Sequence, residues 1–169
     1  MKKVYEKNGY TIYEYNPTVF KPFHVNMEPL TWKRRIRLLM AITSGFKVYY
    51  LVDGENYAGY CLVQNGKDKR YKFATQNDIL VGPYFVSEKY RGKKLSIFLL
   101  DFILKKSDID FENAYDYIGK DNTPSIKASE AVGFEFYSDA RLSKYMRTIS
   151  LCSDDQGEYA IYRYREDPK

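Results

Sequence analysis

The sequence predicts a single domain, residues 1–169, of the α/β (α+β) class: a mixed sheet with helices on both faces. A chain of 169 residues is long enough to bury a hydrophobic core without the help of disulfides or metals. Segments of strand character come first, one strand–helix–strand–helix run follows over residues 79–132, and more strands come after it. This order of strands, one crossover and further strands predicts the fold class.

The N-terminal segment Val4–Tyr13 is predicted to be a β-hairpin. Its Asn8-Gly9 pair is typical of a two-residue turn, because both residues accept positive φ. Three prolines then predict a loop over residues 17–30.

A helix is expected from Trp32 to Thr43, with Thr31 as its N-cap and Gly45 as its end. Four apolar residues fall near helical spacing: Trp32, Ile36, Leu39 and Ile42. Basic residues crowd the first half of the helix, where they oppose its dipole: Lys33, Arg34, Arg35 and Arg37. These cations either form a solvated face, which is the interpretation we favour, or face an anionic ligand.

Two strands, Phe46–Val52 and Tyr57–Val63, are expected to pair through a turn at Asp53–Asn56. After a polar turn, Tyr71–Phe73 is a possible third strand. The next strand is predicted at Ile79–Val86.

The run after that strand predicts a phosphate site. A turn at Ser87–Lys93 feeds a helix at Lys94–Lys106, which is so apolar that it must be covered on most sides. Unpaired N–H groups and the positive end of the dipole favour phosphate at a helix N-terminus. A phosphate-bearing ligand is therefore expected against the segment from Tyr90 to Ser96.

The remaining segments are expected to complete the sheet. A strand at Asn113–Ile118 leads to a helix at Pro124–Val132, with Thr123 as its N-cap and Gly133 as its left-handed end. Three more strands are expected at Phe134–Tyr137, Lys144–Cys152 and Tyr159–Tyr164. The last two, joined by a polar turn at Ser153–Glu158, are predicted to form an antiparallel hairpin.

Composition limits the class of protein. The net charge of +5 suits an anionic ligand or partner but does not identify one. The two cysteines, Cys61 and Cys152, make no disulfide framework, and neither a secretory segment nor a membrane-length apolar run is present. We therefore expect a soluble cytoplasmic protein without membrane association. No metal site is predicted.

Three motifs together resemble the GCN5-related N-acetyltransferase (GNAT) family: Phe85–Ser96, Asn122–Ser125 and Glu130–Phe134. That family's coenzyme loop follows the pattern Arg/Gln-x-x-Gly-x-Gly/Ala. Its later Asn precedes a Gly-Phe pair by the spacing that separates Asn122 from Gly133. The resemblance implies a mixed, mostly antiparallel twisted sheet, split in a V between the strands at residues 79–86 and 113–118.

The same resemblance implies acetyl-CoA as co-substrate, lying in that split. Backbone groups of Phe85 and Val86 would pair with the pantetheine arm, and the Val86 N–H would face the thioester oxygen. Asn122 and Ser125 would flank the pantetheine and thiol end. Backbone amides of one loop would hold the pyrophosphate: Arg91, Gly92, Lys93, Lys94, Leu95 and Ser96.

Three positions depart from the family pattern. Lys94 and Ser96 stand where the family has small residues. We expect the Lys94 Cβ to point away in a helical first turn, so that its ammonium can meet a phosphate. Ser129 stands where many members carry a tyrosine that protonates the departing thiolate. Either a nearby tyrosine or water takes this role, or no acid is needed because the CoA thiolate is a tolerable leaving group near neutral pH. Ser129 and Val86 are the candidate catalytic residues.

The function expected from these features is that of an acyltransferase, which moves an acetyl group from acetyl-CoA directly to a primary amine. A base must take a proton from the amine. Four residues are expected near the split, and none is singled out as this base: Asp78, Tyr84, Glu88 and Asp116. The lone histidine, His24, is a less favoured candidate.

The acceptor is expected to contact residues 17–45 and the closing hairpin. These segments are aromatic and basic, which fits a small anionic acceptor, such as an amino sugar attached to a nucleotide, better than a basic peptide. Acetyl or longer acyl transfer, N- or O-transfer, and a homodimer all stay open. Two other functions are a CoA-binding module without catalysis, which Ser129 permits, and a nucleic-acid binder, which the dispersed basic residues disfavour.

Overall fold

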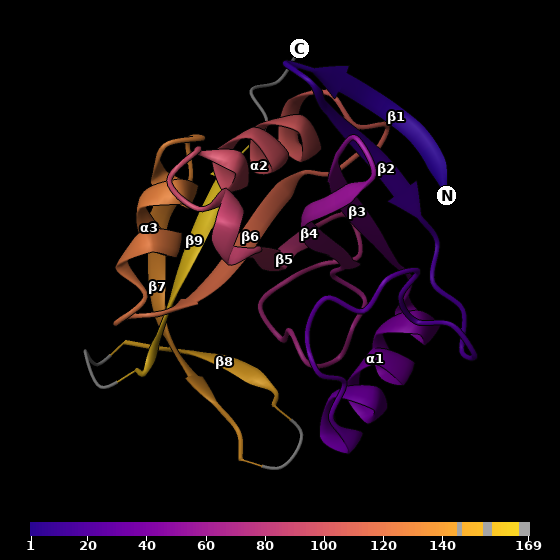
Figure 1. The fold of residues 1–169 in the computed structure, drawn as a ribbon. Coiled ribbons are helices and arrows are strands. Elements are labelled where there is room, and N and C mark those ends of the chain that lie inside the picture. The colour runs from indigo at the N-terminus through magenta and orange to yellow at the C-terminus, as the bar shows by residue number, and fades with distance from the viewer. Residues whose placement is uncertain (145–146, 154–156, 166–169) are drawn as a thin grey trace.

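The structure is a computed structural model that describes residues 1–144, 147–153 and 157–165. Within these residues one nine-stranded sheet runs in the order β1-β2-β3-β4-β5-β6-β9-β7-β8 (Figure 1). All neighbouring strands pair antiparallel except β5 and β6, which are parallel. The predicted mixed, mostly antiparallel sheet is confirmed.

The N-terminal half follows the predicted hairpins. β1 (Lys2–Lys7) and β2 (Tyr10–Tyr15) are joined by Asn8-Gly9, with φ values of 54° and 80°. β3 (Phe46–Asp53) pairs with β4 (Asn56–Asn65).

The third strand expected at Tyr71–Phe73 is wrong. Tyr71 makes an isolated bridge with Ile149 instead. The Tyr71 N–H bonds to the Asp68 carbonyl and the Ala74 N–H to the Tyr71 carbonyl, so successive turns bend this segment out of an extended course.

Helix α1 (Trp32–Ser44) has the predicted caps. The Thr31 side chain accepts the Arg34 N–H, and Gly45 ends the helix at φ 91°. The face that meets the sheet differs from the pattern of large apolar residues, because the buried residues are Leu38 and Ala41.

The outward face of α1 carries the exposed residues Trp32, Ile36 and Leu39. Arg34 and Arg37 share the inward face with Ala41, since positions i, i+3 and i+7 lie on one side of a helix. The Arg34 side chain is 18% exposed, and Arg37 is half-buried. A solvated face is therefore the wrong interpretation for these two arginines.

The predicted V-shaped split is confirmed in the centre of the sheet. β5 (Ile79–Val86) pairs with β6 (Asn113–Gly119) only at Ile79↔Ala114 and Leu80↔Tyr115, and the strands then separate. The segment after β5 forms a short 3-10 helix, η1 (Glu88–Tyr90), before α2 (Leu95–Lys105).

The C-terminal strands correct the predicted hairpin. β9 (Tyr159–Arg165) lies between β6 and β7 (Glu135–Leu142), whereas β8 (Ile149–Cys152) pairs with β7 at the sheet edge. Three successive buried residues, Ala160 to Tyr162, suit β9 for an inner position, and the more exposed β8 suits an edge. The predicted turn at Ser153–Glu158 falls largely outside the described residues.

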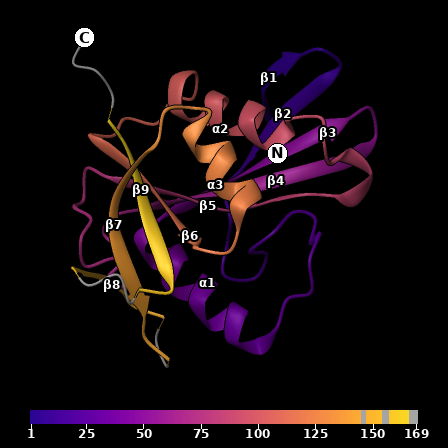
Figure 2. The same cartoon turned by 90° about the vertical axis from the view of Figure 1, so that its left-hand side faces the viewer.

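Helices cover both faces of the sheet, as predicted. Figure 2 shows α2 and α3 (Thr123–Glu130) on one side of the strands and α1 on the other. Six α2 side chains are buried, as its apolar sequence predicts: Leu95, Leu99, Leu100, Phe102, Ile103 and Leu104. None of the described helices is both long and apolar enough to cross a membrane.

Candidate active site

A cleft of about 530 Å³ opens where β5 leaves β6, walled by the end of β5, the loop into α2 and the start of α3. It brings together nine of the residues predicted to hold the coenzyme: Phe85, Val86, Arg91, Gly92, Lys94, Leu95, Ser96, Asn122 and Ser125. The cleft lining does not include Lys93, whose ammonium lies 5.1 Å from the centre of the Tyr90 ring.

The loop before α2 has the backbone geometry of an anion cradle. Gly92 and Lys94 adopt positive φ values of 79° and 58°, and the uncharged first turn of α2 follows. Such a turn directs successive N–H groups to one side, at the positive end of the helix dipole. A turn of this kind can hold an anion such as a pyrophosphate.

Lys94 is not in a helical first turn, which corrects the prediction. It is the residue before the helix and adopts the left-handed conformation, which favours glycine because a Cβ crowds the backbone there. The side chain is nevertheless exposed at the cleft, so its ammonium remains available to a phosphate.

Asn122, not Thr123, caps α3. The Asn122 Oδ1 accepts the Ser125 N–H at 3.3 Å, so the helix begins one residue earlier than predicted. This bond uses the carbonyl end of the carboxamide and leaves the amino end as the group that can meet a ligand in the cleft.

In the antiparallel pair β4–β5, the backbone N–H and C=O groups of successive residues point alternately toward the partner strand and away from it. This alternation determines which backbone groups of β5 face the split. The Ser87 N–H bonds to the Ala58 carbonyl at 2.8 Å. Val86, one residue earlier, is paired with Gly59 and therefore directs its N–H away from β4 and toward the split. Phe85, which is opposite Tyr60, directs its backbone toward β4, and its ring stacks on the Tyr60 ring with 6.0 Å between the ring centres.

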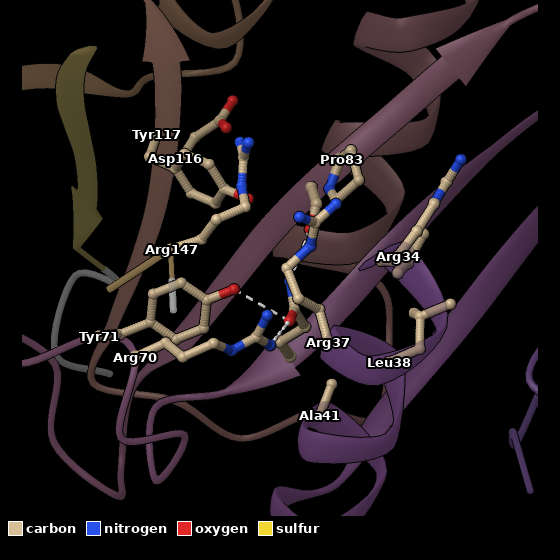
Figure 3. Close-up of a pocket in the computed structure, with 13 residues that line it drawn as sticks. Arg34, Arg37, Leu38, Ala41, Arg70, Tyr71, Pro83, Asp116, Tyr117 and Arg147 are labelled. Carbon is tan, nitrogen blue, oxygen red and sulfur yellow. Dashed lines mark hydrogen bonds between the residues drawn. The ribbon is translucent and has the colours of Figure 1, made fainter. Parts of the chain in front are cut away.

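A second cavity of about 260 Å³ lies on the α1 side of the split (Figure 3). Gly82 and Pro83 of β5, Asp116 and Tyr117 of β6, and several α1 residues line it. Gly82 has φ 115°, and a Cβ there would lie 3.4 Å from the Asp116 Oδ1. A side chain at position 82 would therefore crowd this carboxylate at the cavity lining.

Asp116 is the most perturbed acid of the site. It is 3% exposed, and burial raises its pKa to about 7, although hydrogen bonds from Ser129 and from the Tyr117 backbone oppose the shift. The Ser129 hydroxyl donates to Asp116 Oδ2 at 2.7 Å. A carboxyl with this pKa can exchange a proton near neutral pH.

Tyr84 connects Asp116 to the cleft at the end of β5. Its hydroxyl donates to the Ser125 carbonyl at 3.0 Å and lies 3.4 Å from the Ser129 hydroxyl. Burial is the main cause that raises the pKa of Tyr84, and the nearby Asp116 charge adds to it, so the phenol keeps its proton at neutral pH. The side chain of Tyr84 lines the cleft.

The other predicted site residues lie elsewhere. Ser129 is fully buried, and its hydroxyl is directed at Asp116. Asp78 accepts bonds from Thr75 and Asn113. Glu88 and His24 are exposed, and neither lines the cleft or the second cavity. A sequence signal for Asp116 existed, because it is an acid inside the otherwise apolar and aromatic strand Ala114–Ile118.

Solved structures of acetyltransferases share this fold. A GNAT family acetyltransferase from Elizabethkingia anophelis with acetyl-CoA bound has a TM-score of 0.61 at 15% identity, covering 95% of this chain and 100% of that one. The ribosomal-protein-S5-alanine acetyltransferase from Vibrio fischeri has a TM-score of 0.60 at 15% identity, covering 96% of both chains.

The Campylobacter jejuni N-acetyltransferase PseH has a TM-score of 0.58 at 13% identity, covering 92% of this chain and 99% of that one. The sequence itself matches no protein-family model and no curated protein. At these identities the likeness shows the fold, which is that of the GNAT acetyltransferases.

Proposed function

We propose that the protein is an acetyl-CoA-dependent N-acetyltransferase that transfers an acetyl group directly to a primary amine of a small molecule. The observation that carries this proposal is the presence of two cavities at one split in the sheet. Tyr84–Val86 line the cleft, and Gly82 and Pro83, just before them, line the cavity beside Asp116. Two entrances suit a reaction in which coenzyme and acceptor meet at the same strand.

Two groups of the chain would promote the transfer. When bound, acetyl-CoA supplies a thioester whose carbon accepts the nitrogen lone pair while the C–S bond breaks. The Val86 N–H donates a hydrogen bond to the oxygen that gains negative charge. Asp116 takes the proton of the attacking nitrogen, directly or through water, because a pKa of about 7 matches this task at neutral pH.

Tyr84 would return a proton to the departing sulfur. It lines the cleft and keeps its hydroxyl proton at neutral pH, and it stands near the buried Ser129. Ser129 acts as a positioning residue, since its hydroxyl holds the Asp116 carboxylate instead of entering the cleft. Tyr84 thereby takes the role that the family assigns to the tyrosine replaced by Ser129.

A charge-reversal substitution tests the part of the proposal that concerns acetyl-CoA binding. Lys94→Glu should weaken acetyl-CoA binding, because a carboxylate at this position repels the phosphates. Lys67→Glu is the matched control, since Lys67 is exposed in the turn that bonds to Asp78, at the opposite end of β5 from Val86. Equal affinities in both variants would place the phosphates elsewhere.

The catalytic arm is tested in two steps. A thermal-shift titration with acetyl-CoA comes first, and saturating coenzyme without any stabilisation would overturn the proposal. Release of free thiol is then measured over amino sugars, polyamines, aminoglycosides and peptides. Stabilisation without thiol release for any amine would favour a CoA-binding module, and salt-sensitive oligonucleotide binding without acetyl-CoA stabilisation would favour a nucleic-acid binder.

Amino sugars are the first acceptor class to test within this proposal. The aromatic and basic surroundings of the second cavity, contributed by Tyr71, Tyr117 and several arginines, suit a polar ring with an anionic substituent. A protein amine is the rival acceptor, because the Vibrio fischeri structure is named as a ribosomal-protein-S5-alanine acetyltransferase. Short peptides in the panel separate the two classes.

A further inference from the structure

Four arginines from distant parts of the chain converge on the cavity beside Asp116. They come from α1, from the turn after β4 and from the segment before β8: Arg34, Arg37, Arg70 and Arg147. Figure 3 shows side chains from these segments arranged around one hollow, with the acidic Asp116 among them. The partners of each guanidinium decide whether this positive charge is already neutralised.

Two of the arginines have acidic partners. The Arg34 Nη2 lies 3.3 Å from the Glu28 carboxylate and donates to the Tyr60 hydroxyl at 2.7 Å. The Arg70 guanidinium is clamped by Asp68 and donates to the Gln64 Oε1 at 3.0 Å. These two side chains are fixed parts of the wall, and their charges are compensated within the protein.

The other two arginines are not compensated in this way. Among the described residues, no carboxylate lies within salt-bridge distance of Arg37 or Arg147. Burial lowers the pKa of Arg37, and the neighbouring Arg147 charge lowers it further. Tyr117 opposes this shift, and Arg70 and Arg34 add smaller contributions that lower the pKa. Guanidinium groups that repel one another inside a cavity are stabilised when an anion binds between them.

Asp116, the acid in the cavity lining, does not supply that anion. Its carboxyl is held by Ser129 and the Tyr117 backbone, and burial favours its neutral form up to a pH of about 7. The cavity therefore has two ends of different character: unpaired cations at Arg37 and Arg147, and a proton acceptor at Asp116. A small molecule with an anionic group and an amine would match both ends.

We propose that the cavity selects acceptors that carry an anionic group, a carboxylate or a phosphate, on the same small molecule as the reacting amine. This inference rests on the proposed acetyl transfer and names its substrate class. Arg37 and Arg147 bind the anion through their planar donor groups, and the amine reaches Asp116. A protein N-terminus fits poorly, because the carboxyl of its first residue is consumed in a peptide bond.

The test uses pairs of amines that differ only in the anion. Glucosamine is compared with glucosamine 6-phosphate, ethanolamine with O-phosphoethanolamine, and propylamine with β-alanine, while thiol release from acetyl-CoA is followed. The anionic member should have a kcat/KM at least about tenfold higher, as one charge-assisted contact provides. The first two pairs report a phosphate preference and the third a carboxylate preference. Equal rates within all pairs would overturn the inference.

Three glutamine variants locate the effect. Arg37→Gln and Arg147→Gln should each reduce kcat/KM for the anionic member about tenfold or more and change it little for the neutral member. Arg35→Gln is the control, because Arg35 is exposed on the same helix and does not line the cavity. A loss equal in all three variants, or in none, would contradict the assignment.

A binding measurement keeps this inference separate from the proposed function. Inorganic phosphate and acetate are titrated by thermal shift against wild type and the three variants, without acetyl-CoA. Stabilisation of wild type and Arg35→Gln that is lost in Arg37→Gln and Arg147→Gln supports the anion site even if no amine is acetylated. Absence of a variant-dependent shift overturns the site even if acetyl-CoA binds and reacts.

Discussion

Replacing Asp116 by asparagine should stop acetyl transfer and at the same time stabilise the folded protein at alkaline pH. Asparagine has nearly the same shape, and its side-chain oxygen can accept the bond that Ser129 donates to the carboxylate. It carries no charge and does not accept the amine proton. The substitution therefore separates the loss of folding stability that a buried charge causes from the part that this charge plays in proton transfer.

The size of the stabilisation follows from the pKa of Asp116. Burial raises this pKa from 3.8 to about 7, so the folded state binds the proton more tightly than the unfolded state. Below pH 3.8 both states are protonated and stability is unaffected. Stability then falls as pH rises from about 4 to about 7, by about 4 kcal/mol in all, because each pKa unit is worth about 1.4 kcal/mol.

The assay compares urea unfolding of wild type and Asp116→Asn at pH 5 and pH 8. The stability advantage of the variant should grow by up to about 3 kcal/mol between these two pH values, most of the total calculated above. In parallel, kcat/KM of wild type should rise with pH around 7, and the variant should lose about a hundredfold or more.

Two results would refute this reasoning. A stability difference that does not change between pH 5 and pH 8 would mean that the Asp116 carboxylate ionises without an unusual cost. A variant that stabilises the protein but keeps its rate would place the base on another residue.

Four further substitutions test the same site. Ser129→Ala removes a bond that lowers the pKa of Asp116, so the midpoint of the kcat/KM profile should move to higher pH; an unchanged midpoint would deny Ser129 a positioning role. Tyr84→Phe should reduce kcat about a hundredfold with acetyl-CoA affinity retained, whereas an unchanged kcat would remove Tyr84 as the acid. Gly82→Ala should cost about 1 kcal/mol or more in urea unfolding and reduce kcat/KM, because φ is 115° and the new Cβ would contact the carboxylate; wild-type behaviour would show that the wall tolerates a side chain. Lys94→Gly should raise the unfolding free energy by about 1 kcal/mol while weakening acetyl-CoA binding, and a loss of stability would argue against strain at the left-handed residue.

The local parts of the fold were readable from the sequence. Asn8-Gly9 specifies its turn through backbone preference, and Ile79–Val86 is a strand with the predicted bounds. The insertion of β9 between β6 and β7 could not be read in this way, because it depends on which strand best tolerates burial on both faces. Periodicity placed α1 correctly but did not reveal its buried face, because the small Ala41 meets the sheet and the large Trp32 lies in solvent.

The candidate site shows the same difference between local features, which the sequence indicates, and tertiary contacts, which it does not. The residues that line the cleft lie in short motifs, so the family resemblance could select Asn122 and the loop before α2. In the sequence Asp116 is only one of several candidate bases. Its raised pKa sets it apart from them, and that shift comes from burial, which is a property of the assembled sheet. Arg37 and Arg147 lie far apart in sequence, and only tertiary structure makes them neighbours.

Because β5 and β6 pair over only two residue pairs, the sheet consists of two parts, which we call leaves. We call the short pairing that joins them the seam. Within the described strands, β1–β5 form one leaf and the remaining four form the other, and the seam ends at Tyr115. Asp116 is the next residue beyond the seam, whereas Val86 lies at the far end of its own strand on the opposite leaf. A small rotation about the seam therefore changes the separation between the carboxyl that we propose takes the proton and the N–H that we propose faces the thioester oxygen. The angle between the two leaves is therefore one of the geometric quantities on which the proposed reaction depends.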